Sequence, residues 1–405
     1  MYLKLAWRNI WRNKRRSFIT IASITFAVFL ACVMRSMQLG SYERMIENAA
    51  RFYTGYIQVH KNGYWKDKTI DNSFESDTAL LEEVMNTEGV LVTVPRVESF
   101  ALVSYDGKTK GGLVMGIDPD TENALTKLKD KITKGEFLHK DDDGAIVSEG
   151  LAKYLRIGIG DTLVLIGQGY HGSSAAGLFP VKGIAKFNLP EQNNQTVYLS
   201  LSNARWFYGL SSQLTSISLV VDKAKNVDRI VGDLSQKMDT ASLEIMGWQD
   251  MMPELVQGIE IDNISGRIML WILYAVIGFG MFGTFLMLTA ERMYEFGVMM
   301  SIGMKRISMQ FTVFLEMAMM VTMGVILGIS ISMPMLIYYH YHPIFFGGEM
   351  ADVIEKFGVE AAYFFSLEPS LFYNQAWAIF FMALILAIYP LIVIQRLKPV
   401  EAMRD

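Results

Sequence analysis

The stretch MYLKLAWRNIWRNKRRSFITIASITFAVFLACVM, residues 1–34, decides the fold. Its first 16 residues carry six basic side chains and no acid, and residues 17–34 carry no charge. An α-helix needs about 20 mostly apolar residues, at about 1.5 Å each, to cross the hydrocarbon core of a bilayer. The run continues past Cys32 without a small-residue cleavage pattern. We therefore predict an uncleaved membrane helix that follows a basic amphipathic segment.

Three more stretches lack charge altogether, at 268–290, 317–339 and 369–395. Hydrophobic residues make up 51% of the 405-residue chain and charged residues 19%, below the roughly 25% of soluble domains. Four such runs near the two ends of one chain disfavour buried core helices. The sequence predicts a membrane α-helical fold with four transmembrane helices and a large α+β extracytoplasmic domain inserted between helices 1 and 2.

The predicted segments follow one another along the chain. They are an amphipathic helix at 1–16, transmembrane helix 1 with a stalk at 17–49, the α+β domain at 50–262, helix 2 at 263–290, a short connection at 291–306, helix 3 at 307–339, an outer loop at 340–368, helix 4 at 369–395 and a tail at 396–405.

The distribution of charge predicts the orientation. Residues 1–16, 291–306 and 396–405 each carry a net positive charge, whereas residues 41–262 and 340–370 are net negative. Positive residues near helix ends stay in the cytoplasm, and four crossings place the three positive segments on one side. We therefore expect a multi-pass membrane protein with both termini in the cytoplasm.

Strand and helix patterns in 50–262 are mixed. The expected strands are 55–60, 90–94, 100–104, 112–116, 145–148, 162–166, 181–187, 196–199 and 216–221, and the expected helices are 77–85, 149–155 and 227–238.

A search for catalytic motifs finds no positive sign of an enzyme. Gly107-Lys108-Thr109 resembles the end of a phosphate-binding loop, but Leu102 stands where that loop needs its first glycine, so a turn is favoured. His340 and His342 fit an interfacial belt better than a metal site. The acidic run 141–143 fits a solvated turn better than a cation site. No metal, cofactor or nucleic acid is expected in this chain.

The connection 291–306 has charges at both ends and an apolar, methionine-rich middle. Such a segment suits either a plain connector or a short helix that binds in a partner's groove, because methionine adapts to varied surfaces. Glu316 is a lone carboxylate in helix 3, and burial at membrane depth costs roughly 2.5–3.5 kcal/mol. We expect it to face protein or water, with Arg292 or Lys305 as a partner, and a structural role is favoured over transport.

Glycines predict where helices pack closely, because they let backbones approach. Gly324 and Gly328 lie four residues apart in helix 3, and helix 2 carries Gly278, Gly280 and Gly283. We expect both sets to form packing faces.

Together these features resemble the permease subunits of the MacB–FtsX–lipoprotein-release class of ABC transporters. The similarity covers all four predicted crossings. Residues 5–16 resemble the family's amphipathic first helix, and the tail 397–404 resembles its characteristic end. Gly324 and Gly328, after Phe314-Leu315-Glu316, resemble its third crossing, and 55–60 is most similar to the lipoprotein-release branch. The family's coupling helix is matched by 291–306, at Glu291, Arg292, Glu295, Phe296, Gly297, Met300, Gly303, Lys305 and Arg306.

The resemblance implies a non-catalytic subunit driven by a separate dimeric ATPase, which binds ATP and Mg²⁺. It also implies that the membrane is the bacterial inner membrane and that a second permease, identical or homologous, lies within the lipid bilayer. Met300 stands where relatives usually carry a basic residue, so docking is expected to depend more on packing.

The leading hypothesis for the cargo is a lipoprotein or another amphiphile that is taken from the outer leaflet and passed to an acceptor. Met34, Met37 and Ile264 would then contact acyl chains. The alternatives are a MacB-like efflux or mechanical role and an FtsX-like regulator of a cell-wall hydrolase.

Overall fold

The structure is a computed structural model that describes residues 2–12, 14–50, 54–76, 78–187, 189–348 and 361–398. Within the described residues the chain divides into two compact units. The helical unit lies within 1–43, 258–345 and 362–405, and the α+β unit within 44–257 and 346–361. Residues 349–360 of the expected outer loop and 399–405 of the expected tail lie outside the described residues.

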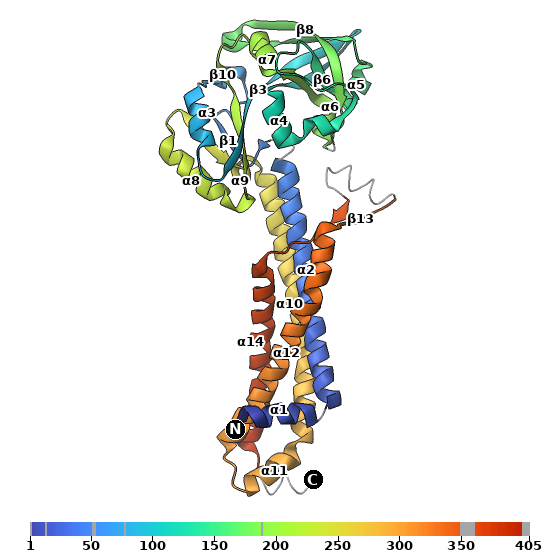
Figure 1. The fold of residues 1–405 in the computed structure, drawn as a ribbon, viewed down its shortest axis with the longest axis vertical. Coiled ribbons are helices and arrows are strands. Elements are labelled where there is room, and N and C mark those ends of the chain that lie inside the picture. Colours follow the sequence, from blue (N-terminus) through green and yellow to red (C-terminus); the bar gives the residue numbers. More distant parts are fainter. Residues whose placement is uncertain are drawn as a thin grey trace. The chain divides into compact units, whose positions relative to one another are not determined.

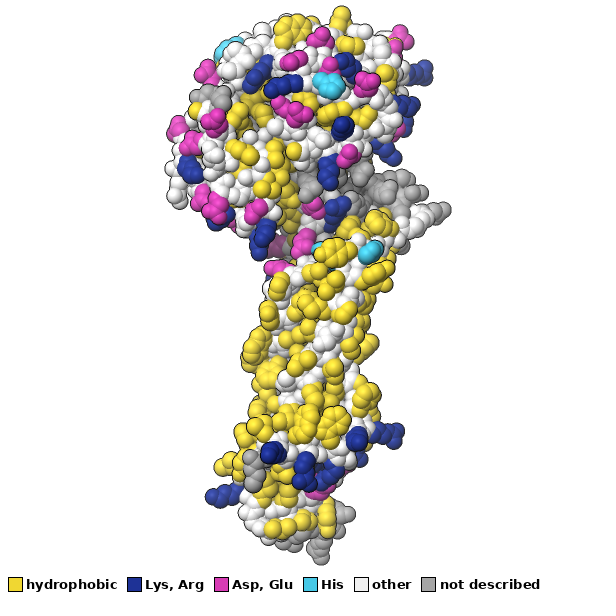
Figure 2. All heavy atoms as spheres, viewed as in Figure 1, with side chains coloured by type: hydrophobic (Ala, Val, Ile, Leu, Met, Phe, Trp, Pro, Cys, Tyr) yellow, Lys and Arg dark blue, Asp and Glu magenta, His cyan; other side chains and the backbone are white. Residues whose placement is uncertain are grey.

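Four helices in the described part of the chain are long and apolar enough to cross a membrane, and the four uncharged stretches fall within them. They are α2 (Lys14–Ala49), α10 (Pro253–Glu291), α12 (Arg306–Tyr341) and α14 (Pro369–Arg396). Hydrophobic side chains cover the visible face of these helices, and Lys and Arg side chains gather at the end where α1 lies (Figure 2).

Two shorter helices complete the helical unit. Helix α1 (Tyr2–Arg12) lies crosswise to the long helices, and α11 (Met293–Ser301) connects α10 to α12 (Figure 1). A small two-stranded sheet pairs β13 (Ile344–Phe345) with β14 (Ala362–Tyr363).

Glycines set the contact between α2 and α12. A Cβ at Gly324 would lie 2.6 Å from the side chain of Ile24, and one at Gly328 would lie 2.6 Å from that of Val28. The Thr25 hydroxyl donates to the Gly324 carbonyl at 3.3 Å. Such close approach needs residues without a side chain, so the expected packing face of helix 3 is confirmed.

The glycines of helix 2 behave differently. Gly278 lies close to the Met382 sulfur of α14, at 3.3 Å from an ideal Cβ, whereas nothing lies within 4 Å of a Cβ at Gly280 or Gly283. The prediction that all three form a packing face is wrong for Gly280 and Gly283 within this chain, because α10 turns them away from its described neighbours.

The α+β unit is built around a ten-stranded mixed sheet in the order β12-β1-β11-β3-β4-β9-β6-β8-β5, with β7 paired to β3 and β8. Its strands are β1 (Ile57–Lys61), β3 (Val90–Tyr105), β4 (Lys108–Ile117), β5 (Ile132–Gly135), β6 (Ala145–Ser148), β7 (Thr162–Gln168), β8 (Ser174–Ala185), β9 (Thr196–Ser200), β11 (Ser216–Val221) and β12 (Leu243–Gly247). A separate short pair joins β2 (Phe74–Glu75) to β10 (Gln213–Leu214).

Seven α-helices within the described part of this unit cover the sheet or connect its strands. They are α3 (Thr78–Met85), α4 (Pro119–Thr126), α5 (Glu149–Leu155), α6 (Pro190–Gln195), α7 (Leu201–Tyr208), α8 (Val227–Lys237) and α9 (Trp248–Met251).

The expected strands 90–94 and 100–104 are one continuous strand, so that division was wrong. Arg96 and Glu98 interrupt the apolar alternation, yet both are buried. The Arg96 guanidinium donates to both carboxylate oxygens of Glu122, at 2.7 and 2.8 Å, and to Glu98 at 3.4 Å. Buried charges are tolerated when they are paired and hydrogen-bonded, and this pairing keeps β3 in the core.

Two motifs that the sequence analysis considered as possible binding sites lie in turns. Gly107 has φ +76° and forms the β3–β4 turn with Asp106, as the turn interpretation of the Gly-Lys-Thr motif predicts. The acidic run was expected in a solvated turn, but Asp142 is only 18% exposed and accepts from the Lys182 ammonium at 2.5 Å and from the His139 amide at 2.8 Å.

Candidate coupling site

Helix α11 is shorter than the predicted coupling helix. Glu291 still belongs to α10, Arg292 breaks the helix at φ −101° and ψ 4°, and α11 ends at Ser301. Gly303 has φ +105° and donates its amide to the Met300 carbonyl at 3.0 Å. A glycine in this left-handed region is the usual helix stop. Residues 291–306 are therefore a helix of nine residues between two sharp bends rather than one continuous helix.

Helix α1 is fixed to the long helices along one face. Ala6 and Ile10 are buried, whereas Trp7 and Trp11 are exposed with their rings 5.8 Å apart. The Ser17 hydroxyl donates to the Ile10 carbonyl at 2.7 Å and locks the bend between α1 and α2. This amphipathic arrangement is typical of a helix at a membrane surface.

Glu316 joins three elements through its carboxylate. One oxygen accepts from the Asn9 side chain of α1 and the other from the Arg292 guanidinium at the start of α11. The side chains of Arg292 and Glu316 are only 12% and 7% exposed. Of the two expected partners, Arg292 is the one present. A shielded pair of this kind costs little only when both charges stay satisfied, so it fixes α1 and α11 onto α12.

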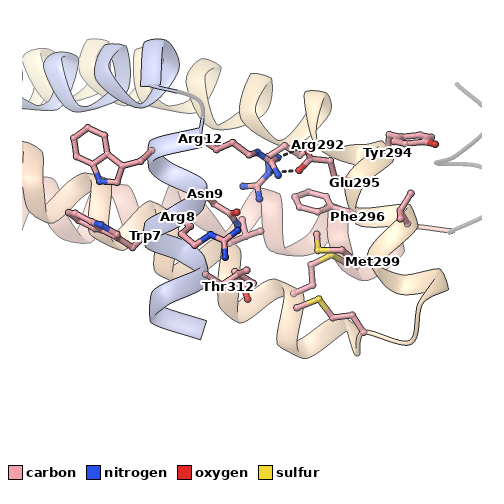
Figure 3. Close-up of a pocket in the computed structure, with 16 residues that line it drawn as sticks. Trp7, Arg8, Asn9, Arg12, Arg292, Tyr294, Glu295, Phe296, Met299 and Thr312 are labelled. Atoms are coloured by element: carbon pink, nitrogen blue, oxygen red, sulfur yellow. Dashed lines mark hydrogen bonds and ion pairs between the residues drawn. The ribbon is translucent and has the colours of Figure 1, made fainter. Parts of the chain in front are cut away.

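Two further ion pairs join the basic N-terminal segment to the connection. Arg12 pairs with Glu295, and Arg16 pairs with Glu291. Glu295 also lies 3.5 Å from the Arg292 Nε atom, and the Arg12, Arg292 and Glu295 side chains converge in Figure 3. The hydrogen bond from Arg12 holds the pKa of the Glu295 carboxyl below its usual range, since it favours the charged form.

These contacts border a hollow of about 830 Å³ between α1, α11 and α12. Trp7 and Arg8 of α1 lie on one side, and Phe296 and Met299 of α11 lie on the other (Figure 3). Thr312 of α12 also lines the hollow. Its polar rim and methionine-rich wall provide a surface on which another protein segment can pack.

The residues predicted for coupling divide into a buried set and an exposed set. Phe296 and Gly297 are buried and Met300 is partly buried, whereas Glu291, Gly303, Lys305 and Arg306 are exposed. Of the exposed residues, Arg306 also donates to the Leu397 carbonyl at 3.1 Å. Their part in coupling stays a prediction, and burial gives Phe296 and Gly297 a role in shaping the site.

Sequence reasoning placed Tyr294 and Ile302 within the predicted coupling segment 291–306 but did not single them out as exposed apolar residues, and it missed Ile307. Tyr294, Ile302 and Ile307 are 59%, 82% and 78% exposed. Isoleucines beside Gly303 in a charged connection were a usable signal, because exposed apolar side chains there lack a structural reason. Asn9 and Arg12 were also missed, and only the excess of bases in 1–16 indicated that acids elsewhere would meet them.

The residues predicted to contact substrate lie in the helical unit. Met34 and Met37 are half-buried on α2, and Ile264 on α10 is exposed. Near them polar contacts join the two helices. Arg35 donates to the Asn263 side chain at 2.9 Å, and the Tyr42 hydroxyl donates to Asp262 at 2.5 Å.

Comparisons with known proteins identify the family. The family model described as MacB-like periplasmic core domain matches residues 17–237, and the model described as FtsX-like permease C-terminal matches residues 267–399. The lipoprotein-releasing system transmembrane protein LolC of Neisseria meningitidis serogroup B is 23% identical over 307 residues, which cover 72% of this chain and 71% of the relative.

Two solved structures are more distant. The extracellular domain of the transporter YknZ from Gram-positive bacteria has a TM-score of 0.34 at 13% identity, with 47% of this chain and 99% of that chain covered. The periplasmic region of MacB from Actinobacillus actinomycetemcomitans has a TM-score of 0.36 at 12% identity, with 50% and 92% covered. At these scores the family assignment depends on the sequence matches. Because the first family model spans more than half of the chain, the chain belongs to the MacB/FtsX/LolC class of ABC transporter permeases.

Proposed function

We propose that this permease releases lipoprotein, or a similar amphiphile, from the outer leaflet of the inner membrane and is driven by an ATPase bound at α11. Both chain ends then lie in the cytoplasm. The observation that carries the docking site is the exposed apolar tip formed by Tyr294 and Ile302. It belongs to a segment that ion pairs fix to α1 and α12.

The rigidity of this segment is what force transmission requires. Glu316 and Arg292 connect α11 to α12, and Arg12 and Glu295 connect it to α1. A partner that pushes on Ile302 therefore moves a fixed corner of the bundle rather than a loose loop. Buried apolar anchors dominate the energetics of most protein interfaces, and Ile302, at 82% exposed, would bury nearly all of its apolar surface if a partner covered it.

The substrate class is supported by the relative from Neisseria meningitidis, whose name describes a lipoprotein-releasing system. The apolar surfaces of α2 and α10 near Met37 and Ile264 suit acyl chains, and the Asp262 contacts close beside them would keep the two helices together. The match to a MacB-like domain leaves an efflux or mechanical role as the second candidate.

Purification of the tagged full chain from its native membranes tests both parts of the proposal. We expect an ABC ATPase and a lipidated protein to copurify and to be identified by mass spectrometry. Ile302→Asp should weaken recovery of the ATPase roughly five- to thirtyfold, as for the loss of an interface anchor worth about 1–2 kcal/mol. Leu91→Asp, which changes a 53% exposed side chain of β3, should leave recovery unchanged.

Other outcomes would decide against parts of this proposal. Full recovery of the ATPase with Ile302→Asp would contradict docking at α11. Copurification of a hydrolase activator without any amphiphile would instead support a regulatory role, and a non-lipidated cargo would support efflux.

A further inference from the structure

The hollow between α1, α11 and α12 is continuous with the exposed tip of α11. Tyr294 belongs to that tip, at 59% exposed, and it also lines the hollow. From there the lining continues across α11 to Thr312 and Val313 of α12 and back to α1. A partner that covers Tyr294 and Ile302 therefore reaches the edge of the hollow without any further movement of the chain.

Helix α1 directs its arginines toward α11. In Figure 3 Arg8 and Arg12 extend from α1 into the space between the two helices, whereas Trp7 points to the other side of α1. Tryptophan is enriched at the headgroup level of a bilayer. The two arginines are thus turned toward the segment that is proposed to meet a protein partner, and away from the side that suits the membrane surface.

The charges around the hollow do not cancel within the described residues. Arg12 pairs with Glu295, and Arg292 pairs with Glu316. Arg8 is exposed, lines the hollow and takes no part in the ion pairs between described residues. Three bases therefore meet two acids here, and the guanidinium of Arg8 is the group left to face an occupant.

Apolar side chains form the walls beside Arg8. Phe296, Met309 and Val313 are buried, and Met299 and Met304 are partly buried. Methionine adapts its shape to whatever packs against it, and a guanidinium binds a carboxylate through two parallel hydrogen bonds. The hollow therefore fits a protruding segment that carries a carboxylate next to an apolar side chain.

We propose that this hollow is a second docking point for the ATPase, in which an acidic side chain of the ATPase pairs with Arg8 while an apolar neighbour packs on Met299 and Met304. The inference rests on the proposed docking at α11 and adds α1 to it. A phospholipid headgroup is a poorer occupant, because the Glu295 carboxylate also lines the hollow and would repel a phosphate. Complementary charge of this kind contributes to specificity and to the rate of association more than to affinity.

Photocrosslinking within the copurified permease–ATPase complex identifies the occupant. The probe is benzoylphenylalanine in place of Leu5, which lines the hollow on α1 and leaves Arg8 intact. Mass spectrometry of peptides should locate adducts on an ATPase peptide that contains Asp or Glu. Adducts found only on lipid would overturn the proposal. So would adducts on residues 396–405 of the chain itself, which include Glu401 and Asp405, because the tail would then fill the hollow.

Three variants measure the contribution of the charge. Arg8→Gln should lower recovery of the ATPase about two- to fivefold, as for one partly exposed ion pair, and should make recovery less sensitive to salt. Arg8→Lys keeps the charge and should retain most of the recovery. Lys14→Gln removes an exposed charge of the same basic segment outside the hollow lining and should leave recovery unchanged.

The combined outcomes separate this inference from docking at α11. A loss with Ile302→Asp but not with Arg8→Gln would overturn the role of Arg8 and leave the tip as the docking point. A loss with Arg8→Gln but not with Ile302→Asp would support the hollow and contradict the tip. Equal losses with Arg8→Gln and Lys14→Gln would show a general effect of positive charge and would overturn the proposal.

Discussion

Helices α10 and α12 have similar length and apolar composition, yet they meet their surroundings in opposite ways. In the most apolar window of α12, 39% of the residues are buried within the chain, against 22% for α10. Gly324 and Gly328 of α12 press against α2, whereas Gly280 and Gly283 of α10 face open space. Small residues in an apolar helix therefore do not by themselves show which face of the helix packs against the rest of the chain.

The contrast extends to polar groups at the end of the two helices where α1 lies. In α12 the buried Glu316 is held by partners from two other elements, Asn9 and Arg292. In α10 the Thr284 hydroxyl bonds only to its own helix, and Phe279 is 78% exposed. Helix α12 acts as the internal support of the bundle. Helix α10 leaves more of its apolar surface uncovered by the described residues.

Glu316→Gln removes the buried ion pair that distinguishes α12 from α10, and it should have the largest effect on stability. The substitution leaves the Arg292 charge shielded without its main partner, and breaking a buried pair in this way costs roughly 3–5 kcal/mol. The measurement is the fraction of full-length chain that stays monodisperse after heating in detergent. Glu291→Gln, which loses only the partly exposed pair with Arg16, is the matched control.

The double variant Glu316→Gln, Arg292→Gln removes both charges and should recover part of the loss, because the two effects are coupled. A Glu316→Gln chain as stable as the parent would show that the pair does not support α12.

Gly324→Leu and Gly283→Leu compare the two helices directly, with a smaller expected effect. A side chain at Gly324 must displace Ile24, and overpacking of this kind costs roughly 1–3 kcal/mol. The same substitution at Gly283 meets no described atom within 4 Å, so we expect no loss. Thermal unfolding of the purified chain, followed by aggregation onset, measures the difference. Equal losses at both sites would mean that Gly283 also lies in a tight contact.

The four long helices could be predicted closely because burial of uncharged stretches in hydrocarbon outweighs every competing effect. The stretch expected at 369–395 is helical at Pro369–Arg396, and the one expected at 307–339 is helical at Arg306–Tyr341. The order of the ten strands could not be predicted, since it depends on long-range pairing. Strand β3 was divided because Arg96 and Glu98 look like surface residues until Glu122, from α4, is brought to them.

The segment of the candidate site was predicted from the family resemblance, but its internal contacts could be predicted only where one residue alone requires a partner. A carboxylate in an apolar helix requires a counter-charge, so Arg292 could be named for Glu316. Asn9 could not, because its contact depends on how α1 packs across α12, and an amide in a basic segment carries no such demand. The same applies to Gly280 and Gly283, whose lack of neighbours is set by the orientation of α10.

The smallest expected effect on stability comes from the Arg12–Glu295 pair in the connection between α10 and α12, and it depends on pH and salt. The pKa of the Glu295 carboxyl is held below its ordinary value near 4.5 by the hydrogen bond from Arg12. Because the folded pKa lies below the unfolded one, the contribution to stability is fully present above about pH 4.5 and is lost as pH falls through the lowered pKa. Side-chain exposures of 53% for Arg12 and 39% for Glu295 limit it to roughly 0.2–1 kcal/mol, which salt screens further. The stability difference between the parent chain and Glu295→Gln should therefore be small at neutral pH, shrink in high salt and disappear in acid. No difference at any pH would mean that α11 is held by its buried contacts, Phe296 foremost, and that the Arg12 pair plays no part in distinguishing the rigid α12 side of the connection from the open α10 side.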